Sequence, residues 1–177
     1  PTRPAGELYE CRNDPQYHYN LIGSKEHRKV LQRLREKLNG PLRETRDLGF
    51  LPEFEAWQAF AGSSGWAVGQ SGSIDLEALR TAASAVGLAG EKTLLANLGS
   101  ANPLIRYWGT IGLGALSSKP SKASLSALEN ALLDSSPSVR IEAANALAND
   151  GFTDIALPIL INELKHENLI VVTHAAR

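Results

Sequence analysis

The stretch of sequence that decides the fold is LDSSPSVRIEAANALA, residues 133–148. Its core, SPSVR at 136–140, repeats NPLIR at 102–106, and a run rich in small residues follows each copy. NLIV at 168–171 begins a third copy. A Pro-x-(Ile/Val)-Arg pattern at a fixed helix start, recurring at about 30–45 residues, is typical of stacked helical repeats.

The helices that precede these motifs repeat as well. Leucines recur 32 residues apart at corresponding positions, namely Leu125, Leu128 and Leu132 against Leu157, Leu160 and Leu164. Small residues on each second helix let neighbouring helices approach closely, and the large apolar residues of each first helix fill the space between layers. We therefore predict a mainly α fold, an α-solenoid of helix pairs over 75–177 with the last repeat truncated.

The repeat motif is similar to the consensus of HEAT repeats. In that family, the turn Asp and the Arg that opens the second helix form a hydrogen-bonded ladder between repeats. The resemblance implies a structural ladder through Asp134, Arg140 and Arg106, with Arg140 bonded to Asp134. The pattern departs from the family at Ser100, His166 and Val172.

The region before the repeats has a different character, with dense charge in place of Ala and Leu. A short strand is expected over 7–11, followed by a turn at 13–15 because Asn, Asp and Pro favour turns. Ser24 is an N-cap residue for a helix over 25–38. We expect the helix to end at 39–41, where Gly and Pro interrupt the pattern.

A Gly/Ser-rich stretch then separates the two regions and is typical of a linker. The predicted organisation is a strand, turn and helix segment over 1–55, a linker over 56–74 and the repeats over 75–177. The linker contains Trp57, Phe60 and Trp66, and we expect these aromatic side chains to lie against an apolar surface.

The first region resembles the C-terminal part of bacterial sulfatases. The similarity is carried by ELYE at 7–10, NDP at 13–15, NLI at 20–22 and TRDLGFLPE at 45–53. It implies that 1–55 is a sulfatase C-terminal remnant from a bacterial periplasmic or other extracytoplasmic protein. The parent would be a hydrolase of sulfate esters that uses a formylglycine and a divalent cation such as calcium.

No catalytic, metal-binding or cofactor-binding residue is expected within the chain itself. The sulfatase formylglycine arises in a C/S-x-P-x-R motif, and the sequence after Cys11 lacks that spacing. A nucleophilic Cys also needs an adjacent base. His18 and His27 fit no zinc-ligand spacing, since a structural site needs four ligands. The single Cys excludes an intrachain disulfide.

Composition narrows the class of partner. The formal net charge is −1, from 18 basic and 19 acidic residues, which speaks against a general polyanion-binding surface. No apolar run approaches the length of a membrane span. We therefore expect neither nucleic acid nor membrane as a partner, and interpret the basic residues at 25–38 as the solvated face of an amphipathic helix.

Two functions remain open at this point. In the first, the chain is the non-catalytic C-terminal fragment of a sulfatase, whose repeats serve domain docking, oligomerisation or protein binding. In the second, it is a stand-alone scaffold that binds a protein or peptide. The start at Pro1 and the helical pattern at 169–177 favour a fragment. Tyr107 and Trp108 are the candidate interaction surface, with packing against the linker tryptophans as the alternative.

Overall fold

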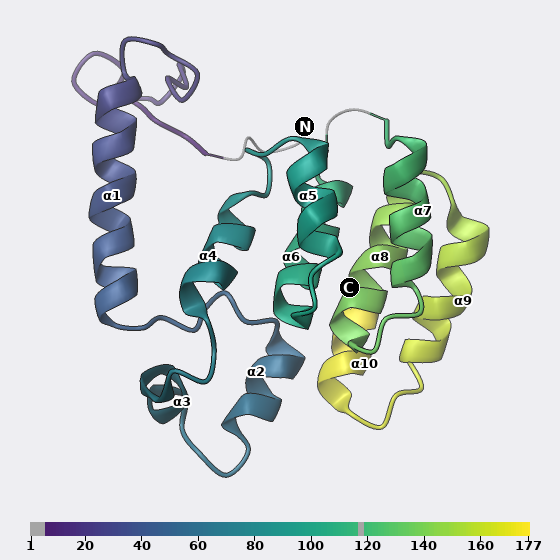
Figure 1. Cartoon of the computed structure of the whole chain (residues 1–177). Coiled ribbons are helices and arrows are strands. Elements are labelled where there is room, and N and C mark those ends of the chain that lie inside the picture. The colour runs from purple at the N-terminus through teal and green to yellow at the C-terminus, as the bar shows by residue number, and fades with distance from the viewer. Residues whose placement is uncertain (1–5, 117–118) are drawn as a thin grey trace. The chain divides into compact units, whose positions relative to one another are not determined.

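A computed structural model describes residues 6–116 and 119–177 (Figure 1). The described residues form helices and loops and contain no β-strand. They divide into two compact units, one ending at Asp47 and the other covering Leu48–Arg177. None of the helices among the described residues is both long and apolar enough to cross a membrane.

The first unit consists of a loop and one long helix. The strand expected over 7–11 is not formed, so this prediction was wrong. The side-chain oxygen of Asn20 accepts the backbone N–H of Leu8 at 3.0 Å, and the Leu8 carbonyl accepts the N–H of Leu21 at 2.7 Å. Because a side chain takes the Leu8 donor, that N–H is not available to a strand ladder.

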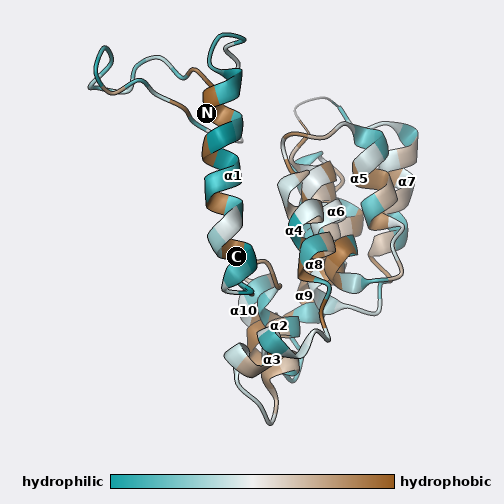
Figure 2. Cartoon of the chain, turned by 60° about the vertical axis from the view of Figure 1, so that its left-hand side comes forward, coloured by the Kyte–Doolittle hydropathy of each residue, from teal (hydrophilic) through white to brown (hydrophobic). Residues whose placement is uncertain are grey.

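The long helix α1 spans Arg28–Glu44 and differs at both ends from the expected 25–38. Ser24 does not cap it, because the Ser24 hydroxyl pairs with His27 Nδ1 at 2.8 Å. Pro41 does not end it, because the Pro41 carbonyl still accepts the backbone N–H of Thr45 at 2.9 Å. Hydrophobic and hydrophilic segments alternate along α1 (Figure 2), but no residue of α1 is buried, and Val30, Leu34 and Leu38 are exposed instead of docked against an apolar surface.

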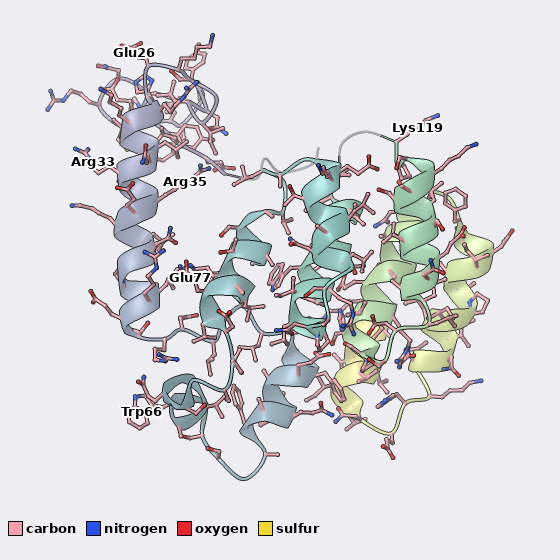
Figure 3. All side chains as sticks on the ribbon, in the orientation of Figure 1. Glu26, Arg33, Arg35, Trp66, Glu77 and Lys119 are labelled. Carbon is pink, nitrogen blue, oxygen red and sulfur yellow. The ribbon has the colours of Figure 1, made fainter. Side chains whose placement is uncertain are left out.

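The stretch expected to be a linker contains two short helices, α2 at Glu53–Phe60 and α3 at Gly65–Ser71. The Ser64 hydroxyl caps α3 by accepting the N–H of Ala67 at 3.2 Å. Trp66 is 76% exposed and points away from the ribbon (Figure 3), and Trp57 is 60% exposed. The two tryptophans therefore do not pack into an apolar surface, contrary to the prediction.

The rest of the second unit is a stack of helices, as the repeats predicted. After α4 at Leu76–Ser84 come three pairs: α5 with α6 at Glu91–Leu98 and Pro103–Gly114, α7 with α8 at Lys122–Ala131 and Pro137–Asn149, and α9 with α10 at Thr153–Glu163 and Leu169–Ala175. We call α5, α7 and α9 the A helices and α6, α8 and α10 the B helices. Helix α8 lies at the centre and contacts α6, α7, α9 and α10.

The repeated motif is a helix-start signal. The side chains of Asn102, Ser136 and Asn168 each accept a backbone N–H from the first turn of α6, α8 and α10. Pro103 and Pro137 occupy the first helical position, where the missing N–H costs nothing. The same local chemistry thus begins every B helix.

The core lies between the A and B helices and consists of apolar side chains, with Leu94, Leu128, Val139, Ala143, Ala144 and Leu147 fully buried. Small residues allow the close approach that the sequence indicated. A Cβ at Gly109 would lie 2.4 Å from the backbone nitrogen of Leu98, so α6 packs directly against the backbone of α5. The small residues of the B helices thus fix the distance between the helices of a pair.

Candidate interaction face

Two arginines at the starts of B helices join successive repeats. Arg106 on α6 binds both carboxylate oxygens of Asp134, at 2.7 and 2.8 Å, across the gap to the next repeat. It also donates to the carbonyls of Ser100 and Ala101 in its own turn. One guanidinium therefore ties the turn of its own repeat to the turn of the following one.

Arg140 makes the equivalent contact one repeat further on, but with a different partner from the expected Asp134. It binds the two carboxylate oxygens of Glu163 on α9, at 2.7 and 3.0 Å. Asp134 offers Arg140 only its backbone carbonyl, at 2.7 Å. His166 occupies the position where an Asp was expected, and Glu163 supplies the carboxylate from the last turn of α9.

The acidic partners of the two arginines, Asp134 and Glu163, are both shielded from solvent and depend on the arginines to stabilise their charge. Burial alone would raise the pKa of Asp134, but the hydrogen bonds from Arg106 and from the N–H of Ser136 outweigh it, so the pKa of Asp134 lies below its ordinary value. The same pair raises the pKa of Arg106. The side chain of Glu163 is 2% exposed, so its charge depends on Arg140 for compensation.

A second cluster contains side chains from all three B helices, and we call the surface that they form the B face. It is formed by Tyr107 and Trp108 of α6, Glu142 of α8 and His174 of α10. His174 Nε2 lies 2.6 Å from a carboxylate oxygen of Glu142, and the ring centroids of Tyr107 and His174 are 6.4 Å apart. Burial, with the charges of Glu142 and Glu55, raises the pKa of Tyr107 to about 12.

Part of the B face is covered by the chain itself. The indole N–H of Trp108 donates to the carbonyl of Phe50 at 2.8 Å, and the two rings meet edge to face. Glu55 on α2 accepts the hydroxyls of Ser136 and Ser138 at 2.5 and 2.7 Å. Trp108 therefore packs against residues just before the predicted linker, not against the tryptophans within it.

Several of these residues were not singled out from the sequence. Glu55 and Glu163 read as ordinary surface charges in a helical pattern, and Ser136 and Ser138 as turn residues. One feature of the sequence could have indicated Glu163. His166 stands where an Asp was expected to pair with the arginine of the repeat, so another acidic residue nearby was needed as the partner of Arg140. The side chain of Cys11 is exposed, and the described residues contain no group of His, Cys, Asp and Glu that could hold a metal.

Comparison with known proteins identifies the stack. Residues 91–177 match the model of the family described as HEAT repeats. This range begins at α5 and covers all three helix pairs, so these pairs are HEAT repeats. The match does not extend to residues 1–55, and the sulfatase resemblance stays a prediction. No curated protein and no solved structure matches the chain significantly.

The lowered pKa of Asp134 predicts an acid-sensitive part of the stability. A group with a depressed folded pKa stabilises the fold above its unfolded pKa, and this contribution is lost as the pH falls through the folded value. The loss therefore begins near the ordinary value of 3.8 and continues below it. We expect Asp134→Asn to flatten this part of the profile, measured as the urea unfolding free energy between about pH 7 and pH 2. Asp150→Asn, an exposed control, should retain the wild-type profile.

The burial of Glu163 predicts a large effect for its partner. Arg140→Ala leaves a buried carboxylate without its counter-charge and should lower the free energy of unfolding by about 3–5 kcal/mol. Arg177 pairs with Glu53 on the surface at 4.0 Å, and Arg177→Ala should change the free energy of unfolding by less than about 0.5 kcal/mol. Chemical denaturation of both variants tests this, and equal losses would contradict the assigned role of Arg140.

Proposed function

We propose that the chain is a protein-binding scaffold whose HEAT repeats hold a partner protein on the B face. The observation that carries this proposal is the cluster of Tyr107, Trp108, Glu142 and His174 across three successive repeats. Repeat stacks commonly bind partners along a surface shared by several units. Tyr and Trp are also the residue types that most often dominate the energy of protein interfaces.

The geometry of the face supports binding through side chains held in place beforehand. Tyr107 packs against Trp108 with ring centroids 5.3 Å apart, and His174 is fixed by Glu142. Tyr107 also packs against the apolar core of the stack. Such an ordered face loses little side-chain entropy when a partner binds.

The more specific form of the proposal is that the scaffold belongs to a sulfatase-type hydrolase as its non-catalytic C-terminal part. The support is the sequence similarity at 7–22 and 45–53 together with HEAT repeats after it. The partner would then be the catalytic domain or a second copy of the chain. The alternative is a stand-alone scaffold that binds another protein or a peptide.

A binding experiment tests the scaffold function. The full chain is immobilised, a retained protein is identified and purified, and its affinity is measured by calorimetry. We expect the double variant Tyr107→Ala, Trp108→Ala to bind at least about tenfold more weakly, as loss of central aromatic residues does. Trp66→Ala removes an aromatic outside the B face and should bind like wild type. Unchanged affinity of a folded double variant would refute the role of the B face.

The sulfatase-specific form is tested separately from the scaffold. We expect the reading frame that encodes the chain to carry a C/S-x-P-x-R motif upstream of Pro1. The chain alone should hydrolyse no aryl sulfate, with or without Ca²⁺, because the motif lies outside it. If the reading frame lacks this motif, the sulfatase-specific proposal is refuted and the stand-alone scaffold remains. Metal-dependent turnover of aryl sulfate by the chain would contradict both proposals.

A further inference from the structure

One segment of the second unit lies on the B helices without belonging to the repeats. We call residues 48–60 the covering segment. It contacts each of the three repeats in turn. Phe50 meets Trp108 of α6, Glu55 meets Ser136 and Ser138 at the start of α8, and the Phe54 ring lies edge to face against His166, just before α10, at 6.0 Å.

The covering segment is held by hydrogen bonds together with two aromatic contacts. Helix α2 has no buried residue, and Pro52 is the buried member of the segment. A cavity of about 340 Å³ remains beside it, lined by Phe54, Glu55, Gln58, Ser136, Arg140 and His166 among others. The segment therefore covers the surface without filling it.

The surface beneath the covering segment has a definite chemistry. It presents the indole N–H of Trp108 and the hydroxyls of Ser136 and Ser138, which are donors that need acceptors when water is excluded. With the covering segment seated, Ser138 is 1% exposed, so its hydroxyl is shielded from solvent. The carboxylate of Glu55 accepts from both hydroxyls at once, and the Phe50 carbonyl accepts from the indole.

The covering segment thus shows which ligand this surface accepts. The ligand must supply one carboxylate for the two hydroxyls, an aromatic ring perpendicular to that of His166, and a carbonyl for Trp108. A short peptide provides all three when a free backbone carbonyl precedes a helical turn that has an aromatic residue directly before an acidic one, as Phe50, Phe54 and Glu55 do within the chain. A basic or polyanionic ligand would provide neither the single carboxylate nor the ring.

We propose that the covering segment is an intramolecular ligand, and that the surface beneath it binds an acidic, aromatic-bearing helical peptide of a partner protein that displaces it. This rests on the proposed scaffold function and adds the chemistry of the partner. The covering segment then competes with the partner for Trp108, Ser136 and Ser138. Binding in trans is weak while the segment is seated and strong once it is released.

The experiment uses the full chain and a fluorescently labelled synthetic peptide of residues 48–61 as the probe. In the released variant, Phe54→Ala with Glu55→Lys, the segment loses its ring and its carboxylate. We expect this variant to bind the peptide at least tenfold more tightly than wild type, measured by fluorescence anisotropy. Glu53→Gln alters a neighbouring exposed acid of the same helix and should bind like wild type.

Two further measurements separate specific binding from adhesion to an exposed surface. A peptide with Gln in place of Glu55 should bind the released variant at least tenfold more weakly. Ser138→Ala added to the released variant should weaken binding of the unaltered peptide in the same way. If the released variant fails to fold by circular dichroism, Glu55→Gln replaces it, with the same order of affinities expected.

The proposal is overturned if a folded released variant binds no peptide, if it binds no better than wild type, or if the Gln peptide binds equally well. The scaffold function has its own readout. A purified partner protein that depends on Tyr107 and Trp108 while the peptide fails to bind would refute this inference and leave the scaffold function intact. Peptide binding without such a partner would support the inference alone.

Discussion

The stack depends on how each repeat is tied to the next, and in this chain two guanidinium groups make the bidentate contacts of that connection. Arg106 and Arg140 each bind the two oxygens of a carboxylate in a neighbouring element and the carbonyls of their own turn. A bidentate pair of this kind fixes orientation as well as distance. Helices that pack through Ala and Gly have smooth surfaces, so a directional contact at one end defines their register.

The contacts of these two arginines separate what the sequence predicts from what it does not. The motif at 102–106 and 136–140 predicted helix starts, repeat length and close packing, because these follow from local chemistry. The partner of Arg140 did not follow from it. Glu163 lies three residues before the position that the consensus assigns to an acid, and only the turn after α9 determines which carboxylate reaches the guanidinium. A motif thus specifies the need for a counter-charge without specifying its source.

Two predictions about the first unit were wrong for a related reason. The strand expected over 7–11 was inferred from residue types, but the side chain of Asn20 takes the N–H of Leu8 that a ladder would use. Pro41 was expected to end α1, yet Pro removes a donor and keeps its carbonyl, which accepts from Thr45. In both places a specific hydrogen bond runs against the predicted structure, and composition carries no information about which donor meets which acceptor.

The start of α8 joins helix capping to the contact with the covering segment. The hydroxyls of Ser136 and Ser138 stand at the start of α8, one residue on either side of the proline that begins the helix. The Ser136 hydroxyl accepts the N–H of Val139, capping the helix, while it donates to Glu55. The cap that begins the repeat helix is thus also part of the surface that holds the covering segment. Ser138 has no hydroxyl counterpart in the other two copies of the motif, where Leu104 and Ile170 stand, so the pair of hydroxyls that holds Glu55 is particular to the start of α8, and the group that caps this helix is in place once the helix has formed.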